Sequence, residues 1–290
     1  MKTKVTRAIE PNQGVQKKFQ KKLLSFQKEF QAMVLKDIVQ ALQDKSLLAA
    51  DAKPSKKGKM TPIAGAVAVS LFVSRFVKNN LTRWNKYLRA KAKTLASWFC
   101  RSVAGSTTQA QKQALALAGV PHLRIKKCFG IPVINRQYVS EKAAKNLPKY
   151  IDEVTNLISG ISTGEVARLQ DVLVSGLEYG QSLEKIKNVL MTFKDFDAKR
   201  ASRVALDQSI KINQQIQRDN AIDVGVTHAI WVHVPGQYTS RQSHMRMNGK
   251  KFEINQGMYD PAVNKYVKPG ELPYCRCIMR LVVDEDTLSA

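Results

Sequence analysis

An 89-residue stretch without an acidic side chain sets the strongest limit on how this chain folds and what it contacts. From Ala52 to Ser140 there is no Asp or Glu, while the same stretch carries 17 Lys and Arg residues. Basic helix faces are usually balanced by acids three or four positions away. Here that balance is missing, so the positive charges repel one another unless a polyanion supplies the counter-charge.

The charge excess of the whole chain lies almost entirely in its first half. The 290 residues carry a formal net charge of +24. Residues 1–130 hold 26 basic and 5 acidic side chains, whereas residues 131–290 hold 21 basic and 18 acidic ones. An enzyme for a small metabolite does not need such a half, so the distribution favours nucleic acid or an anionic membrane surface as the partner.

Composition and length predict two domains of an α+β, predominantly helical class. Residues 1–130 are expected to form a basic helical region, with a linker near 49–61 where Pro, Gly and Lys gather. Residues 131–290 are expected to form a helical lead-in and a C-terminal module, in which a long helix precedes short strands and ordered loops. A content of 44% hydrophobic residues allows a packed core.

Helical periodicity is clearest in the basic half. Apolar residues recur at spacings of three and four through 15–46 and again through 81–103, which predicts two amphipathic helices. Between them, the uncharged run 60–74 is shorter than the roughly 20 apolar residues of a bilayer span. We expect a buried helix there, with an interfacial or inserting segment as the alternative. The Gly-Ser-Thr-Thr sequence at 105–108 is expected to break the second helix, before a short helix that ends at Leu117.

The second half mixes helices with short strands. Residues 120–139 contain Pro, Gly and β-branched residues, and are expected to form short strands or an ordered loop. Helices are expected from Ser140 onward, with a capping box at Ser162-x-x-Glu165 and a stop at Gly180.

A shorter helix, a long helix and a loop-rich end are expected after residue 180. After a shorter helix at 183–193, Asp197 is expected to cap a long helix that Gly225 closes. The alternating, Val- and Trp-rich run 227–235 predicts a strand, and the run 281–284 a closing strand in an otherwise loop-rich end.

Basic side chains of the acid-free stretch are the candidates for contact with double-stranded DNA. Such binding would act through phosphate charge and not through sequence. Trp84, Tyr87 and Trp98 lie among these cations, but their helical spacing predicts core positions and not base stacking. The alternative is that the basic faces are only solvated. The candidate residues are Lys53, Lys56, Lys57, Lys59, Arg83, Lys86, Arg89, Lys91 and Lys93.

A set of residue types near the C-terminus occurs in a recognisable order. A helix with an R-x-x-R pattern precedes a strand with a Trp, an R-x-x-H sequence, a Gly and a PGE-x-P-x-CRC segment. Over roughly residues 195–282 this order resembles the Mu F-like minor head proteins of tailed bacteriophages. Asp207-Gln208 stands where a Thr-Glu pair is common in that family. The family-motif residues are Arg203, Trp231, Arg241, His244, Gly249, Pro269, Gly270, Cys275, Arg276 and Cys277.

The resemblance implies a low-copy minor capsid protein that acts in head morphogenesis. It implies the phage portal protein and other head proteins as partners, with a place in the virion, inside the head and near the portal, after a stage in the host cytoplasm during assembly. Some such proteins leave the head with the DNA. An ejection protein that binds DNA, or the host membrane through 60–74, is therefore the alternative function.

Two thiols and a histidine in the motif are candidate metal ligands. His244, Cys275 and Cys277 carry the atom types that bind a structural zinc, with His228 or His233 as a fourth ligand. The C-x-C spacing is tighter than the common C-x₂₋₄-C. A disulfide between these two cysteines is not expected, because a one-residue loop strains the bridge.

The same residues allow two other interpretations. In the first, the buried cysteines act as small hydrophobes, His244 satisfies loop carbonyls, and Arg241 and Arg276 tie loops together. In the second, Cys275 or Cys277 forms a catalytic pair with His244. No oxyanion-hole motif, Gly-rich phosphate loop or paired carboxylates accompany the pair, so no enzymatic activity is expected, and no cofactor other than the structural zinc.

Overall fold

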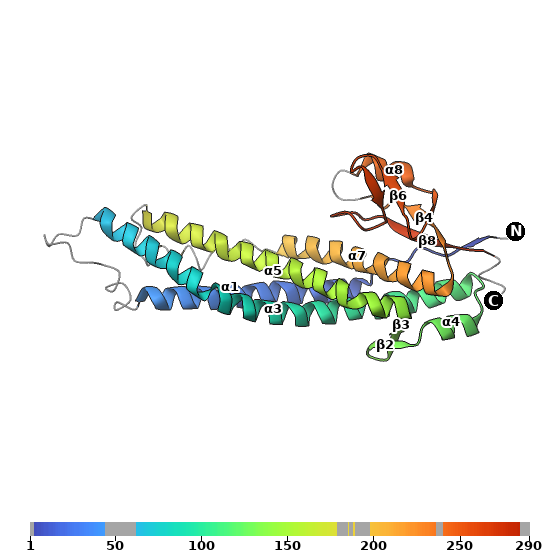
Figure 1. The fold of residues 1–290 in the computed structure, drawn as a ribbon, viewed down its shortest axis with the longest axis horizontal. Helices are drawn as coiled ribbons and strands as arrows, with labels where there is room; N and C mark the ends of the chain where they lie inside the picture. The colour runs from blue at the N-terminus through green and yellow to red at the C-terminus, as the bar shows by residue number, and fades with distance from the viewer. Residues whose placement is uncertain are drawn as a thin grey trace. The chain divides into compact units, whose positions relative to one another are not determined.

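Long helices account for most of the described chain, and short antiparallel strands for much of its C-terminal part (Figure 1). This computed structural model therefore confirms the α+β, predominantly helical class. The chain forms two compact units, one built from 1–20, 96–154 and 199–290, and the other from 21–95 and 155–198. We call them the sheet unit and the helical unit. The structure describes residues 3–43, 62–178, 185, 188, 198–235 and 240–284.

Three long helices pass through both units, namely α1 (Gln13–Gln43), α3 (Pro62–Leu117) and α5 (Glu141–Glu178). Helix α1 confirms the amphipathic helix predicted at 15–46, and α3 confirms helix in the uncharged run from Pro62 onward. The side chains of 62–73, the linker at 49–61, the stop at Gly180 and most of the helix predicted at 183–193 lie outside the described residues. No helix among the described residues is both long and apolar enough to span a bilayer.

The helical unit has an apolar interior lined by all three helices. Buried side chains on its part of α1 include Phe30 and Ile38, and those on α3 include Trp84 and Leu88. The indole N–H of Trp84 donates a 2.8 Å hydrogen bond to Oδ2 of Asp37, so this ring is fixed by a polar contact as well as by packing.

The capping box predicted at Ser162 and Glu165 is wrong. Both residues lie inside the continuous helix α5 and are buried. The Ser162 hydroxyl is 3.0 Å from the Ile158 carbonyl oxygen and 2.8 Å from Oε1 of Gln27 in α1. A serine whose hydroxyl bonds to the carbonyl four residues earlier is compatible with a helix interior, so the same sequence pattern does not start a helix here.

The helix break predicted at 105–108 is also wrong, because α3 continues to Leu117. Thr107 and Thr108 are buried and accept hydrogen bonds from side chains of α7 (Ala198–Val224). Gly105 lies where a Cβ atom would come within 2.8 Å of the Cβ of Gln137. The small and polar residues are therefore packing and hydrogen-bonding positions in a continuous helix.

Residues 120–139 form a short helix as well as the expected strands. Helix α4 (His122–Cys128) was not predicted, because it is only two turns long and buries Ile125 alone, which leaves no periodicity to detect. The strands β2 (Ile131–Ile134) and β3 (Gln137–Val139) pair as an antiparallel hairpin, which confirms the short strands predicted for this stretch.

A four-stranded antiparallel sheet forms the centre of the sheet unit, with strand order β1-β8-β4-β5. The predicted strands are confirmed as β4 (His228–Val232) and β8 (Ile278–Val283), which pair with Ala229 opposite Leu281. The long helix that Gly225 closes is confirmed as α7; Gly225 has a φ of 87°, which favours glycine. The edge strands are β1 (Lys4–Val5) and β5 (Lys251–Glu253).

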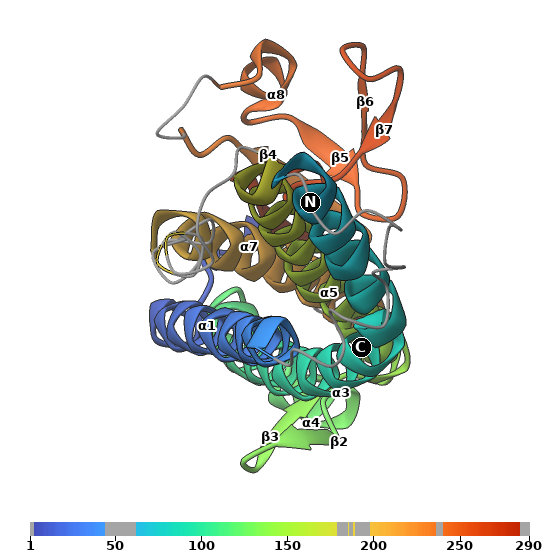
Figure 2. The same cartoon turned by 90° about the vertical axis from the view of Figure 1, so that its left-hand side faces the viewer.

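Helices and a hairpin cover the two faces of this sheet. In Figures 1 and 2, α7 lies on one side of the sheet, and α8 (Gln242–Met247) and the hairpin of β6 (Met258–Asp260) and β7 (Lys265–Val267) lie on the other. The core between them contains Trp231, Phe252 and both C-terminal cysteines.

The N-terminal residues belong to the same unit as the C-terminal sheet. Lys4 pairs with Val283, and the Leu281 N–H donates a 3.0 Å hydrogen bond to Oγ1 of Thr6. Both units thus take segments from either side of residue 130. The charge of the sequence changes near residue 130. That a domain boundary lies there stays a prediction.

Candidate functional site

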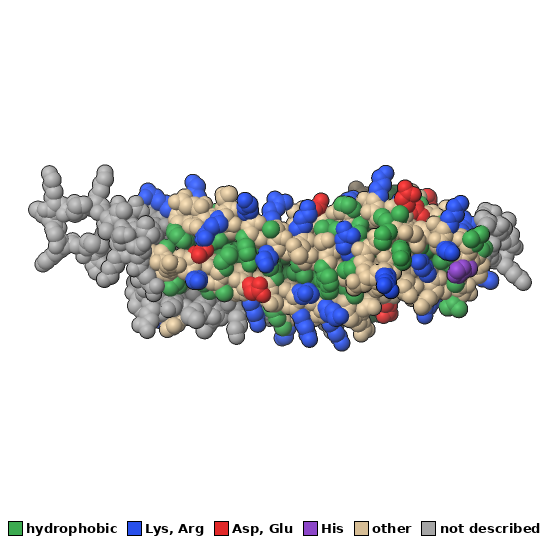
Figure 3. Space-filling view, turned by 90° about the horizontal axis from the view of Figure 1, so that it is seen from below, with side chains coloured by type: hydrophobic (Ala, Val, Ile, Leu, Met, Phe, Trp, Pro, Cys, Tyr) green, Lys and Arg blue, Asp and Glu red, His purple; other side chains and the backbone are tan. Residues whose placement is uncertain are grey.

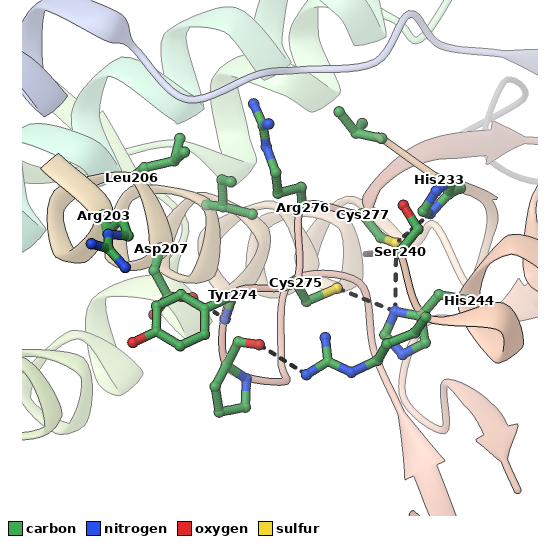
Figure 4. A pocket seen from close by; sticks show the side chains of 14 residues that line it. Arg203, Leu206, Asp207, His233, Ser240, His244, Tyr274, Cys275, Arg276 and Cys277 are labelled. Carbon is green, nitrogen blue, oxygen red and sulfur yellow. Dashed lines mark hydrogen bonds between the residues drawn. The ribbon is translucent and has the colours of Figure 1, made fainter. Parts of the chain in front are cut away.

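A pocket in the sheet unit brings most of the family-motif residues together. Its volume is about 540 Å³, and its walls come from α7, the segment after β4, α8 and the loop before β8 (Figure 4). The motif residues that line it are Arg203, Arg241, His244, Cys275, Arg276 and Cys277. The other motif residues, Trp231, Gly249, Pro269 and Gly270, do not line the pocket and lie in neighbouring parts of the chain.

His244 lies at the inner end of the pocket, where α8 packs against β6. Only 2% of its surface is exposed. Its Nε2 is 3.2 Å from Oδ2 of Asp260, which is fully buried at the end of β6. The imidazole therefore has a carboxylate as its partner, and the prediction that it satisfies loop carbonyls is wrong. With Nε2–H donated to Asp260, the lone pair of Nδ1 faces the other way.

The two thiols of the CRC segment converge on that second ring nitrogen. Sγ of Cys275 lies 3.4 Å from Nδ1 of His244, and Sγ of Cys277 lies 3.6 Å from the same atom (Figure 4). Both cysteines are buried and carry free thiols. The three ligand-type atoms lie within 4.8 Å of one another, so the structure places together the set that the sequence predicted as metal ligands.

The pKa values of the two cysteine thiols shift in opposite directions. The pKa of Cys275 is lowered to about 4, chiefly because its sulfur accepts a hydrogen bond from the Cys277 thiol, against the opposing effect of burial. The pKa of Cys277 is raised, because it donates that hydrogen bond and is itself buried. The pair thus favours one thiolate next to one thiol, which is a soft, electron-rich site.

Asp260 is the residue at this site that sequence reasoning missed. Burial alone would raise its pKa, but the hydrogen bonds from the Ala262 N–H and His244, together with the nearby Ser243 hydroxyl, outweigh burial, and the pKa is lowered. Asp260 is therefore a carboxylate that orients the imidazole. Nothing in its surroundings in the sequence, Met-Tyr-Asp-Pro, marks it as functional.

Trp231 and two glycines shape the back of the site. The Trp231 ring is fully buried and meets the His244 ring edge-on, with the centroids 5.3 Å apart. Gly249, with a φ of 76°, donates its N–H to the Trp231 carbonyl at 2.8 Å. Gly270 has a φ of 73°, and a Cβ atom there would lie 3.3 Å from Cγ2 of Ile210 in α7, so both motif glycines occupy positions that a side chain would strain.

The motif arginines hold loops together, as predicted for two of them. Nη2 of Arg241 donates a 3.0 Å hydrogen bond to the Pro273 carbonyl, and Nη1 of Arg276 donates one of 3.3 Å to the Pro235 carbonyl. Arg203 is exposed on α7 at the outer end of the pocket (Figure 4). These contacts link the loop before β8 to the segments on both sides of it.

Asp207 secures the same loop from α7. Its Oδ1 accepts the Tyr274 N–H at 2.5 Å, and Tyr274 has a φ of 59°, a conformation that costs energy for a residue with a side chain. Burial raises the pKa of Asp207, although this hydrogen bond and one from Gln208 oppose the shift. The position at which the sequence departs from the family pattern therefore has a clear structural role.

The two histidines considered as a fourth metal ligand lie differently. Nδ1 of His233 is 3.6 Å from Sγ of Cys277, on the pocket wall. Nδ1 of His228 instead contacts Oγ1 of Thr227 at 2.9 Å, at an exposed position. Only His233 is therefore in reach of the cluster.

Exposed cations follow one side of α3 in the helical unit. At 100° per residue, Arg75, Lys78, Lys86, Arg89 and Lys93 fall on one stripe about 27 Å long, and all five are exposed. We call them the α3 stripe. Lys and Arg side chains stand out on the face that Figure 3 shows, with few acidic side chains among them.

The remaining DNA candidates lie apart from this stripe. Arg83 pairs with Asp37 at 2.7 Å, and Nζ of Lys91 lies 5.8 Å from the Tyr87 ring centroid. Trp84 is buried as predicted, but Tyr87 is 37% exposed and not a core residue. The four candidates outside the described residues are Lys53, Lys56, Lys57 and Lys59.

Comparison with protein families gives one match. Residues 167–280 match the family described as Phage Mu protein F like protein, which confirms the resemblance found in the sequence for this part of the chain. The match includes the whole of α7, the pocket and the His244–Cys275–Cys277 cluster. No curated protein and no solved structure matches the chain.

Proposed function

We propose that this chain, whose residues 167–280 are Mu F-like, is a minor head protein that docks at the portal and contacts packaged DNA without sequence preference. The Mu F-like segment supports head morphogenesis and a place in the virion. The portal and neighbouring head proteins are the partners that this assignment implies. The division of charge along the chain supports the second part, contact with double-stranded DNA.

The observation that carries the DNA contact is the α3 stripe. Its cations stand on a helix that contains no acidic residue over its whole length. Lys86, Arg89 and Lys93 are separated by three and four residues, so they project from the same side of the helix. Phosphates of a DNA backbone would relieve the repulsion among these charges and release their own counterions.

Neutralising part of the stripe tests this contact. In the full-length chain, the triple substitution Lys86→Gln, Arg89→Gln and Lys93→Gln should weaken binding to any duplex sequence by a similar factor. The slope of log affinity against log salt concentration should fall by about 0.9 for each phosphate contact that is lost. Fluorescence anisotropy with labelled duplexes of unrelated sequence at several salt concentrations measures both quantities.

A matched triple variant controls for net charge. Arg246→Gln, Lys250→Gln and Lys251→Gln remove the same numbers of Lys and Arg from exposed positions in the sheet unit. This control should retain most of the affinity and the salt slope. Equal losses in the two triple variants would show that DNA responds only to total charge, and would remove the stripe from the proposal.

Particle composition tests the head assignment. Quantitative mass spectrometry of purified virions should find the chain at a few copies per head, and cross-linking should join it to the portal protein. Particles that lack the chain before DNA release would contradict its place in the virion. Cross-links to shell or tail proteins only would contradict docking at the portal.

An ejection protein is the second candidate, and the uncharged start of α3 favours it. Helix α3 has no charged residue from Pro62 to Ser74 and then continues into the stripe at Arg75. Such a segment suits a bilayer interface next to anionic lipid headgroups. Loss of the chain from particles after DNA release, with leakage of anionic liposomes by the full-length protein, would support ejection; retention in emptied heads would exclude it.

A further inference from the structure

The distances within the His244 cluster match those of a tetrahedral zinc site. Zn–S bonds are about 2.3 Å and Zn–N bonds about 2.0–2.1 Å, so neighbouring N and S ligands of one zinc ion lie about 3.6 Å apart. The N-to-S distances here are 3.4 Å for Cys275 and 3.6 Å for Cys277, both measured to Nδ1 of His244. Both N-to-S distances therefore match a single coordination tetrahedron, and all three ligand atoms lie within 4.8 Å of one another.

A candidate fourth ligand lies beside Cys277, although it is not part of the close group that the other three ligand atoms form. Nδ1 of His233 lies 3.6 Å from Sγ of Cys277, and His233 follows β4 while Cys277 directly precedes β8, its pairing partner. Figure 4 shows His233 and His244 on opposite sides of Cys277. A turn of the His233 side chain towards the other three ligands would complete a Cys₂His₂ donor set, a common set for structural zinc.

The surroundings supply the outer contacts that zinc ligands usually have. A zinc-binding histidine commonly donates its other N–H to a carboxylate, and Asp260 occupies that position at 3.2 Å. The indole N–H of Trp231 and the backbone N–H of Val234 are directed at Cys277 Sγ. Trp231 Nε1 is buried with no oxygen or nitrogen partner among the described residues, so a thiolate is the acceptor it needs.

From this geometry we infer that the sheet unit binds one structural zinc ion through Nδ1 of His244, Sγ of Cys275 and Sγ of Cys277, with the His233 side chain turning in as the fourth ligand. The ion would join α8, the residue after β4 and the loop before β8. His244, Cys275 and Cys277 are buried and His233 is half-buried, which suits a largely closed structural site. Because loops of this kind bury little apolar area, zinc binding would contribute directly to folding.

Metal content and spectroscopy of the full-length chain test the inference. The reduced protein, purified without added chelator, should contain close to one zinc per chain by elemental mass spectrometry. After exchange, Co²⁺ should give the visible absorption of tetrahedral coordination and the near-ultraviolet bands of thiolate ligation. Competition with a chromophoric chelator gives the affinity.

Matched variants distinguish ligands from neighbours. Cys275→Ser and Cys277→Ser should lose the thiolate bands and most of the bound metal, while Cys128→Ser, which changes a half-buried thiol elsewhere in the sheet unit, should keep both. His233→Asn should alter the Co²⁺ spectrum, and His228→Asn should leave it unchanged. Asp260→Asn should weaken binding about 10–100-fold without changing the ligand set.

Three results would overturn the inference. The first is a folded full-length chain that takes up neither Zn²⁺ nor Co²⁺ at micromolar concentration. The second is binding that Cys128→Ser abolishes and Cys275→Ser leaves intact. The third is rapid alkylation of Cys275 that zinc does not slow, which would support the catalytic Cys–His pair, with Asp260 as the residue that orients His244.

Discussion

Asn220 of α7 donates a 2.8 Å hydrogen bond from Nδ2 to Oγ1 of Thr108 in α3, at a position where neither residue is exposed to solvent. The same amide group also donates to Oε1 of Gln111 at 3.0 Å, and its Oδ1 accepts the Ser140 N–H at 3.2 Å. One side chain thus joins two helices and the start of a third. Because buried polar groups are costly when unpaired, this network fixes how the helices register in the sheet unit.

Replacing Asn220 should destabilise the sheet unit strongly. Asn220→Ala removes three hydrogen bonds and leaves buried partners unsatisfied, so we expect a loss of about 3 kcal/mol in the free energy of unfolding. Urea unfolding followed by circular dichroism measures it. Asn79→Ala, at an exposed position of α3, should change the stability by less than about 0.5 kcal/mol. Equal effects of the two substitutions would show that the network contributes little.

This network also explains which parts of the fold the sequence could predict. Helices α1 and α7 and strands β4 and β8 follow from apolar periodicity, which reports a face turned towards a core. Thr107 and Thr108 of α3 are buried but polar, so they interrupt that pattern and suggest a break where α3 is continuous. A buried polar side chain that hydrogen-bonds to another helix adds nothing to the apolar periodicity that can be detected in a single sequence.

The residues of the candidate site could likewise be predicted only in part from the sequence. His244, Cys275 and Cys277 could be selected from the sequence because their side chains have few roles other than metal binding or catalysis. Asp260 could not, since acidic residues are common and its role depends on β6 lying beside α8. The choice of His233 over His228 depended on which face of the chain after β4 meets the CRC loop, which only the three-dimensional structure provides.

Two helix glycines should respond in opposite ways to alanine. At Gly105, a Cβ atom would lie 1.9 Å from Oε1 and 2.8 Å from Cβ of Gln137, so Gly105→Ala should destabilise by about 1–3 kcal/mol despite the higher helix propensity of alanine. At Gly160 in α5 nothing lies within 4 Å, and Gly160→Ala should stabilise by about 0.5–1 kcal/mol. Thermal unfolding of both variants tests the contrast, and stabilisation by both would refute the close packing of Gly105.

Tyr150 should contribute to stability through its hydroxyl. Its OH donates a 2.6 Å hydrogen bond to Oδ2 of Asp219, and Nδ2 of Asn146 donates one of 3.0 Å to the other carboxylate oxygen. Tyr150→Phe keeps the ring and removes the donor, so we expect a loss of about 1.5–3 kcal/mol at neutral pH, the range for hydrogen bonds to charged groups. Tyr138→Phe, which changes an exposed tyrosine, is the control and should be nearly neutral.

Asp219 should make the stability of the sheet unit depend on pH. Burial raises the pKa of Asp219 above its usual value near 4, against hydrogen bonds from Tyr150 and Asn146 that lower it. The folded state therefore holds the proton more tightly than the unfolded state. It follows that this contribution to stability is complete below about pH 4 and is lost as pH rises through the folded-state pKa.

Comparing variants across pH isolates that contribution. Relative to Asp219→Asn, which cannot titrate, the wild-type chain should lose unfolding free energy as pH rises from about 4. In Tyr150→Phe the loss should extend to higher pH, because the removed hydrogen bond no longer lowers the Asp219 pKa. The double variant should follow Asp219→Asn in its pH dependence. Urea unfolding between pH 4 and pH 8 measures each curve, and a wild-type curve parallel to that of Asp219→Asn would show that the buried carboxyl group does not titrate in this range.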